Sequence, residues 1–137
     1  MKKTVVVSGY FNPVHQGHIK MFQKASKYGK VIVILNNDKQ VKIKGSVPFM
    51  KQSERKVILE SIKYINKVII SIDKDGSVCK TLELIKPDYF ANGGDRKAGN
   101  IPEYDLCKRL NIKMLFNIGG RKTQSSSKLI KQCQKIQ

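Results

Sequence analysis

The chain has 137 residues and a formal net charge of +17 at pH 7, because 27 lysines and arginines stand against 10 acidic residues. This length fits one domain with its own core, and no shift in composition marks a linker, so we expect a single domain over residues 1–137. No apolar stretch approaches the roughly 20 residues of a membrane span. The first residues lead into a short strand rather than into the apolar segment of a signal peptide, which favours a cytoplasmic protein.

The strong positive charge leaves a nucleic-acid-binding module open as one function. The lysines are scattered singly, however, and the aromatic residues, 7% of the chain, do not alternate with basic residues as they do on surfaces that stack on bases. A solvated lysine-rich surface that attracts polyanionic substrates is the favoured interpretation. The cysteines, Cys79, Cys107 and Cys133, are far apart and unpaired in spacing, so we expect free thiols.

Short apolar runs alternate with helical patterns along the chain. We expect strands near Thr4–Ser8, Lys30–Leu35, Lys67–Ser71, Tyr89–Ala91 and Lys113–Phe116. The other patterns predict helices near Gly17–Tyr28, Gln52–Tyr64, Val78–Lys86, Pro102–Leu110 and Ser125–Cys133. This alternation is typical of an α/β fold in which helices cover both faces of a parallel sheet.

The segment Gly9–His18, directly after the first expected strand, is the most informative part of the chain. His15 and His18 are three residues apart at a helix start, so their side chains project from one face of the first turn. The N–H groups of a helix start attract anions. Gly9 permits a tight turn, and Gly17 has no Cβ to obstruct a ligand between the imidazoles. A zinc site is disfavoured, since the chain has only these 2 histidines.

Three later segments carry further candidate residues. The polar connection Asn36–Lys51 contains Lys44-Gly45 and is longer than a connector needs, which indicates either a functional loop or a mobile surface loop. The paired glycines of Asn92–Arg96 permit unusual backbone conformations, although a plain turn is the alternative. Gly119–Ser127 places two cations and three hydroxyls ahead of a helix, which favours phosphate binding over simple capping.

Together these segments resemble the H-x-G-H nucleotidyltransferases, and most closely the cytidylyltransferase-like family. That family includes glycerol-3-phosphate cytidylyltransferase and heptose-phosphate adenylyltransferase. The resemblance covers nearly the whole chain and is carried by the histidine turn, Asn37-Asp38 with Lys44-Gly45, Glu54-Arg55-Lys56, Asn92–Arg96 and Gln124–Ser127. It implies a Rossmann-like, doubly wound, five-stranded parallel sheet in the order 3-2-1-4-5.

The resemblance also implies roles for individual residues. The catalytic residues would be His15, His18, Lys44 and Arg121. Relatives carry this arginine one position later, so Lys122 could fill its place. Acceptor binding would fall to Asp38 and Arg96, and Arg55 would either contact the nucleotide or form an exposed pair on its helix. The nucleotide-binding residues would be Gly9, Tyr10, Phe11, Asn12, His15, Gly17, His18, Lys44, Arg55, Asn92, Gly94, Asp95, Gln124, Ser125, Ser126 and Ser127.

The implied reaction transfers a nucleoside monophosphate from a nucleoside triphosphate, CTP ahead of ATP, to a phosphorylated small molecule. Glycerol 3-phosphate or a sugar phosphate would be the acceptor, and pyrophosphate would be released. Mg²⁺, held mainly by the substrate phosphates and not by a protein metal site, is the implied cofactor. An adenylyltransferase of cofactor biosynthesis is one alternative, and the basic nucleic-acid-binding module is the other. Homodimers are common in this family, and we expect one here.

Overall fold

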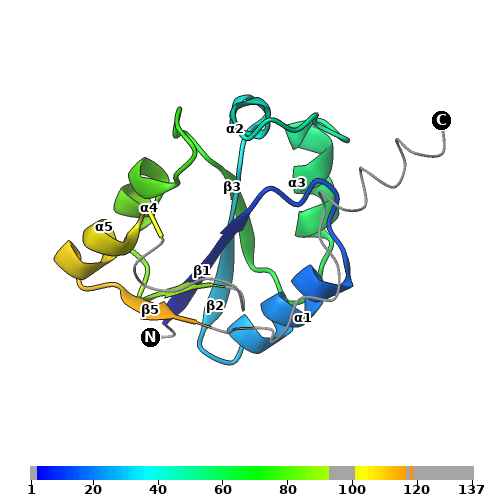
Figure 1. Cartoon of the computed structure of the whole chain (residues 1–137). Helices are drawn as coiled ribbons and strands as arrows, with labels where there is room; N and C mark the ends of the chain where they lie inside the picture. The colour runs from blue at the N-terminus through cyan, green and yellow to red at the C-terminus, as the bar shows by residue number, and fades with distance from the viewer. Residues whose placement is uncertain (1–2, 93–100, 117, 119–137) are drawn as a thin grey trace.

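The computed structural model describes residues 3–92, 101–116 and 118 of the chain. These residues form a five-stranded, all-parallel sheet in the order β3-β2-β1-β4-β5, which confirms the expected fold class and strand order (Figure 1). The strands are β1 (Thr4–Gly9), β2 (Lys30–Leu35), β3 (Lys67–Ile70), β4 (Tyr89–Ala91) and β5 (Lys113–Leu115). Valine and isoleucine make up half of β1 and most of β2 and β3, as is usual for strands covered on both faces.

The carboxyl ends of the central strands align at one edge of the sheet. Gly9 of β1 pairs with Leu35 of β2, and Leu35 pairs with Ile70 of β3. On the other side of β1, Val7 pairs with Ala91, the last residue of β4. The chain winds outward from β1 to β3 and then returns to β4, so the strand order reverses between β1 and β4. Doubly wound sheets bind ligands at this reversal.

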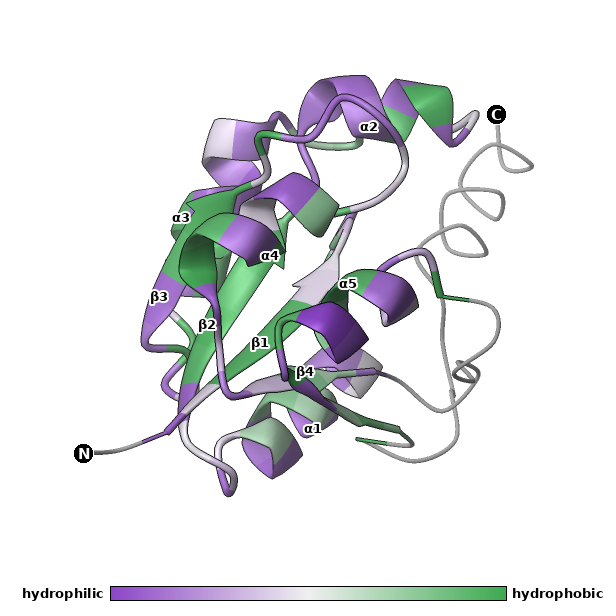
Figure 2. Cartoon of the chain, turned by 90° about the vertical axis from the view of Figure 1, so that its left-hand side faces the viewer, coloured by the Kyte–Doolittle hydropathy of each residue, from purple (hydrophilic) through white to green (hydrophobic). Residues whose placement is uncertain are grey.

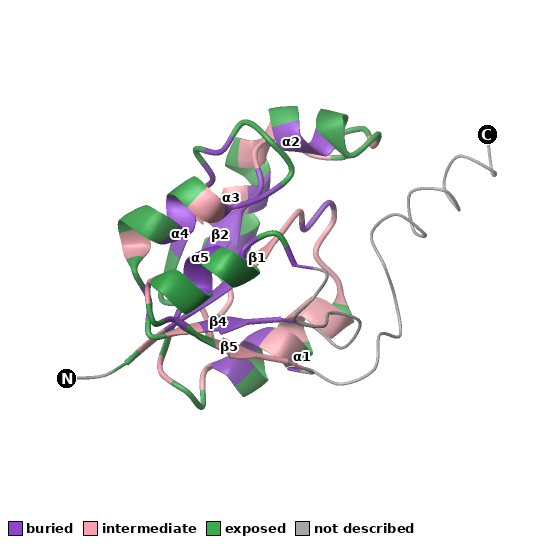
Figure 3. Ribbon diagram, turned by 60° about the vertical axis from the view of Figure 1, so that its left-hand side comes forward, coloured by how far each residue is buried: buried purple, intermediate pink, exposed green. Residues whose placement is uncertain are grey.

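Helices cover both faces of the sheet, as the sequence predicts. They are α1 (Gln16–Ala25), α2 (Asp38–Ile43), α3 (Gln52–Glu60), α4 (Cys79–Ile85) and α5 (Tyr104–Arg109). Figure 1 shows α1 and α3 on one side of the sheet and α4 and α5 on the other. In Figure 3 the central strands are mostly buried, whereas the helices turn exposed residues outward. Among the described residues, no helix combines the length and the apolar character needed to cross a membrane.

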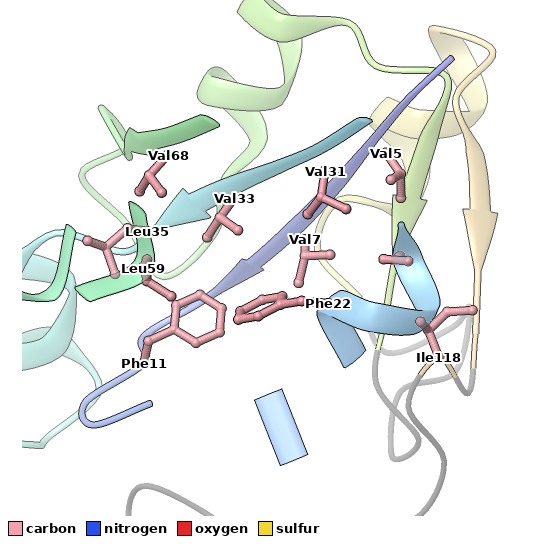
Figure 4. Packing of buried hydrophobic residues seen from close by; sticks show 12 residues of the cluster. Val5, Val7, Phe11, Phe22, Val31, Val33, Leu35, Leu59, Val68 and Ile118 are labelled. Carbon is pink, nitrogen blue, oxygen red and sulfur yellow. The ribbon is translucent and has the colours of Figure 1, made fainter. Parts of the chain in front are cut away.

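Alternation along the central strands divides the core into two clusters. Val5 and Val7 belong to the cluster beneath α1 and α3, whereas Val6 belongs to the cluster beneath α4 and α5. Figure 2 shows these strands as an apolar layer between helices of mixed character. In the first cluster the Phe22 ring of α1 lies 5.5 Å, between centroids, from the ring of Phe11 in the turn after β1 (Figure 4). The core therefore extends into the segment that carries the histidines.

The four predicted helices that fall within the described residues are each shorter than predicted, and α1 and α3 lose the most at their carboxyl ends. The patterns extend α1 to Tyr28 and α3 to Tyr64, whereas both helices end earlier, each followed by a serine. The hydroxyls of Ser26 and Ser61 each donate to the carbonyl oxygen three residues before them, at 2.5 and 2.6 Å. Such bonds offer the backbone an alternative to the helical ladder, so they account for the early ends.

The connection between β2 and α3 contains a helix, α2, that the sequence patterns do not predict. The interpretation of residues 36–51 as a loop is therefore wrong for Asp38–Ile43. Asn37 Oδ1 accepts from the Gln40 N–H at 2.9 Å, and Gln40 Oε1 accepts from the Asn37 N–H at 3.0 Å. This reciprocal capping stabilises the helix start. Lys44 caps the other end, and Gly45 follows it with φ +88°, a conformation that glycine adopts readily.

Candidate functional site

The two histidines cap helix α1 with their own rings. His15 is the N-cap residue, and its Nδ1 accepts from the Gly17 N–H at 3.1 Å. His18 Nδ1 accepts in turn from the His15 N–H, also at 3.1 Å. The bonds form a capping box in which imidazoles replace the usual hydroxyl and carboxylate. Each ring is therefore fixed in orientation by a backbone bond at the helix start.

This capping also determines which ring nitrogen carries the proton. A neutral imidazole has one acceptor and one donor nitrogen, so a ring that accepts at Nδ1 has its hydrogen on Nε2. The two rings stack with centroids 3.7 Å apart and planes inclined by 23°, and both residues are half-buried. Each imidazole thus carries its hydrogen on Nε2, and N–H groups of this kind are donors that phosphate oxygens accept.

The two glycines are required by the packing of this turn. A Cβ on Gly17 would lie 3.1 Å from His15 Cε1, so the imidazole itself occupies the adjacent space. A Cβ on Gly9 would lie 2.9 Å from Cζ of Phe11. From the sequence, we expect the missing Cβ of Gly17 to leave room for a ligand between the imidazoles. In the structure, the His15 ring itself lies next to this position.

Phe11 and Asn12, predicted to contact the nucleotide, lie beneath the histidines. Each residue is only 2% exposed. The Phe11 ring meets the His18 ring edge-on, with centroids 4.8 Å apart. The Asn12 amide bonds to the backbone of a distant segment, at Val47 O and at the N–H of Phe49. The structure therefore makes these two side chains supports of the turn and does not expose them to a ligand.

Lys44 follows helix α2 and lies against Tyr10 of the histidine turn. Its Nζ is 4.4 Å from the centroid of the Tyr10 ring, and its side chain is exposed at the end of α2. An ammonium over an aromatic face gains about 0.5–1 kcal/mol at an exposed position. Lys44 therefore contacts the turn that carries both histidines, through the ring of Tyr10.

Arg55 is buried, so the alternative of an exposed pair on its helix is wrong. The residue is 1% exposed, and its guanidinium forms a 2.6 Å ion pair with Asp38 Oδ1. Its Nη1 donates to Tyr10 O at 2.6 Å and to Asn36 O at 3.0 Å, and its Nε donates to Met50 O at 3.0 Å. The guanidinium therefore joins the turn after β1, the end of β2 and the start of α3.

Of the remaining predicted residues, only Asn92 lies within the part of the chain that the structure describes. Asn92, at the end of β4, is buried, and its Nδ2 donates to Phe90 O at 3.3 Å and Leu115 O at 3.4 Å. This position lies beside β1 at the reversal of strand order. The others lie outside the described residues: Gly94, Asp95, Arg96, Arg121, Lys122, Gln124, Ser125, Ser126 and Ser127, with the predicted helix Ser125–Cys133.

A polar network that the sequence reasoning missed supports α2 at the carboxyl edge of the sheet. Asn37 Nδ2 donates to Ser71 O at 2.9 Å and to Asp73 O at 3.1 Å. Gln40 Nε2 donates to the backbone oxygens of Asp75 and Ser77, both at 2.8 Å. These bonds span 34 to 37 residues, so no local pattern indicates them. They tie α2 to the segment that follows β3.

Three ionisable groups of the described residues, Asp75, Cys79 and Cys107, have shifted pKa values. Hydrogen bonds from the hydroxyl and N–H of Ser77 hold the pKa of Asp75 below its usual value. Burial raises the pKa of the Cys79 thiol, and raises that of Cys107 to about 11. Both cysteines are free thiols, as the sequence predicts, and both are protonated at neutral pH.

The fold and the turn define a class: an α/β protein whose first helix starts with two capping histidines at the reversal of a doubly wound sheet. A sequence model of the "Cytidylyltransferase-like" family matches residues 6–131. The chain belongs to this family, which confirms the resemblance.

The chain is similar to two curated relatives and to one solved structure. A bifunctional protein HldE of Aliarcobacter butzleri is 32% identical over 137 residues, covering 98% of this chain and 28% of that protein. An FAD synthase of Ferroglobus placidus is 35% identical over 95 residues, covering 69% of this chain and 60% of that protein. A lipopolysaccharide core biosynthesis protein of Thermoplasma volcanium superposes with a TM-score of 0.75 at 23% identity, covering 89% of this chain and 100% of that one. This chain thus spans about 28% of the length of HldE.

Proposed function

We propose that the chain transfers a nucleoside monophosphate from a nucleoside triphosphate to a phosphorylated small molecule and releases pyrophosphate. The observation that carries this proposal is the pair of imidazoles held through Nδ1 at the start of α1. Two Nε2–H donors from stacked rings match the charge that develops on the oxygens of a transferring phosphoryl group. Membership of the cytidylyltransferase-like family supports the same reaction class.

In the proposed reaction an oxygen of the acceptor phosphate attacks the α-phosphorus, and the bond from that phosphorus to the bridging oxygen of pyrophosphate breaks. The attacking phosphate has a second pKa near ~6, so it is largely dianionic at neutral pH and needs no general base. His15 and His18 would donate hydrogen bonds to the α-phosphate, while Lys44 would neutralise charge on the triphosphate. Catalysis would rest on positioning and on charge stabilisation.

We propose that Mg²⁺ binds mainly through the triphosphate oxygens. Within residues 3–92, 101–116 and 118, no three His, Cys, Asp or Glu side chains come together in a set that could hold a metal ion. Phosphate oxygens are preferred ligands of Mg²⁺, which usually keeps several waters and few protein ligands. The ion would supply charge neutralisation on the pyrophosphate leaving group.

The donor nucleotide is either ATP or CTP. The FAD synthase relative favours ATP, because FAD carries an adenylate, whereas the family description favours CTP. Sugar phosphates, glycerol 3-phosphate and a flavin phosphate are the acceptors to test. Nucleoside triphosphates are made and used in the cytoplasm, which is the expected compartment of the reaction. A homodimer stays a prediction, and analytical ultracentrifugation tests it.

The experiment is a pyrophosphate-release assay with Mg²⁺, in which ATP and CTP are tested separately against this acceptor panel. We expect His18→Ala to lower kcat by about 100-fold, since it removes one donor to the transition state. Gln16→Ala is the matched control, because Gln16 is exposed between the two histidines and should retain wild-type turnover. Near-normal turnover in His18→Ala would contradict the mechanism. Absence of release with every pair, together with salt-sensitive binding to nucleic acid, would favour the binding module.

A further inference from the structure

A buried amide connects the histidine turn to the segment that follows Lys44. Asn12 Nδ2 donates to Val47 O at 2.8 Å, and Asn12 Oδ1 accepts from the Phe49 N–H at 2.5 Å. These two bonds span 35 and 37 residues. The donor and the acceptor of one side chain therefore both bind the backbone of one short segment.

Two apolar side chains of the segment 44–50 gain little from packing. Val47 is 65% exposed and Phe49 is 57% exposed, so burial of apolar surface contributes little to their position. Gly45, with φ +88°, has open space around its Cβ position. Hydrogen bonds hold the segment at two places: the N–H groups of residues 44–46 donate to carbonyl oxygens of α2, and the Asn12 amide bonds to Val47 and Phe49.

The same segment begins at Lys44, whose ammonium lies over the ring of Tyr10. Tyr10 and Asn12 belong to the same turn, so this turn contacts the segment at its first residue through the ring and at Val47 and Phe49 through the amide. A shift of the segment away from the turn would move the ammonium away from the histidines as well. A displacement of about 1 Å at a reacting group can lower a rate about 100-fold.

We propose that Asn12 is a positioning residue, which holds the segment 44–50 against the histidine turn and thereby keeps Lys44 beside the phosphates of the nucleotide. The catalytic part of this inference rests on the proposed function. Direct contact between Asn12 and a nucleotide does not fit the geometry, because the residue is 2% exposed and both atoms of its amide are already bonded within the protein.

The chemistry of the amide provides a graded set of variants. Asn12→Ala removes both bonds. Asn12→Asp keeps an oxygen that accepts from the Phe49 N–H, but it places a second oxygen against Val47 O, where a donor is required. Asn66→Ala is the matched control, because Asn66 Oδ1 likewise accepts a backbone N–H, that of Val31 at 3.0 Å, near the start of β2.

Amide hydrogen exchange tests the contact without any substrate. We expect exchange at the Phe49 N–H to be at least about 10 times faster in Asn12→Ala than in the wild type. Asn12→Asp should keep the protection of Phe49, and Asn66→Ala should leave it unchanged. Unchanged exchange at Phe49 in Asn12→Ala would overturn the inference, and this outcome does not depend on whether the chain is a transferase.

A double-mutant cycle with Lys44→Met tests whether Asn12 acts through Lys44. With the wild-type lysine, we expect Asn12→Ala to lower kcat/KM about 10-fold, whereas with Lys44→Met the same change should lower it less than about 2-fold. Independent, multiplicative effects would overturn the positioning role. If the wild type releases no pyrophosphate with any pair, the proposed function fails, while the exchange of Phe49 still decides whether Asn12 holds the segment.

Discussion

The turn 9–18 and the connection 36–51 both bring residues to the candidate site, but they are built differently. In the turn, the bonds that orient the imidazoles join residues two and three positions apart. In the connection, the bonds from Asn12 and Arg55 to the facing backbone span 35 to 45 residues. The turn is thus a local structure, whereas the connection depends on the assembled fold. Variants that disturb only the imidazoles should change the chemistry with little effect on stability, and variants that release the connection should change both.

Removal of the Arg55 side chain should have the largest effect, since it releases the connection. Arg55→Ala leaves the backbone oxygens of Tyr10 and Asn36 without their donor and Asp38 without its buried partner. We expect a loss of about 3 kcal/mol in the free energy of unfolding, measured by urea denaturation. Arg109→Ala, at an exposed position of α5, should lose less than about 0.5 kcal/mol. If Arg55→Ala lost as little free energy of unfolding as Arg109→Ala, the connection would not depend on the assembled fold more than the turn does.

A change within the turn should affect turnover more than stability. In Gly17→Ala the new Cβ would lie 3.1 Å from His15 Cε1, so the ring must move by a few tenths of an ångström. We expect kcat to fall about 10-fold, while the free energy of unfolding changes by less than about 1 kcal/mol. Gly76→Ala is the control, because its Cβ would have nothing within 4 Å. Unchanged turnover in Gly17→Ala would show that the ring position is not critical.

The cap of α2 should have a smaller effect than Arg55. Asn37→Ala removes the acceptor for the Gln40 N–H and the donor to Ser71 O and Asp73 O. We expect a loss of about 1–2 kcal/mol in the free energy of unfolding. Asn37→Asp keeps the cap but not the donor, so its stability in urea denaturation separates the two contributions. Equal losses in the two variants would assign the whole effect to the donor.

The alkylation rate of the Cys107 thiol is the smallest expected effect. It reports which variants expose this part of the core to solvent. Its pKa is raised to about 11 and its side chain is fully buried, so at pH 8 the folded protein should react very slowly with iodoacetamide. The reaction should speed up as the pH rises toward that pKa, because the thiolate fraction increases. Mass spectrometry of the Cys107 peptide should show faster alkylation at pH 8 in Arg55→Ala than in Gly17→Ala. Fast reaction in the wild type would contradict the burial of this thiol.

Local patterns in the sequence predict most of the fold and the turn. The strands β2 and β4 have the predicted bounds, and the order of strands follows from the family resemblance. The histidine pair could be predicted because its spacing acts through local helix geometry. The cap of α2 also left a local signal, since Asn37 stands three residues before Gln40, as in a capping box.

The roles of Asn12 and Arg55 could not be predicted from local patterns. Arginine is almost never fully buried unless it is paired, and its partner Asp38 lies 17 residues away on another helix. The atoms that bind the Asn12 amide are backbone atoms, which any residue type provides, so no residue type marks them. The family resemblance indicates that these positions matter, but only the three-dimensional arrangement shows that they act from beneath the site.

The aromatic rings beneath the histidines have a consequence for protein engineering. From Phe22 to Phe11, from Phe11 to His18 and from His18 to His15, ring centroids follow one another at 5.5, 4.8 and 3.7 Å. A substitution that repacks α1 to improve heat resistance would therefore be transmitted to the imidazoles. The opposite face, beneath α4 and α5, has its own cluster of buried residues. A thermostable variant with unchanged turnover is thus best designed on that face of the sheet.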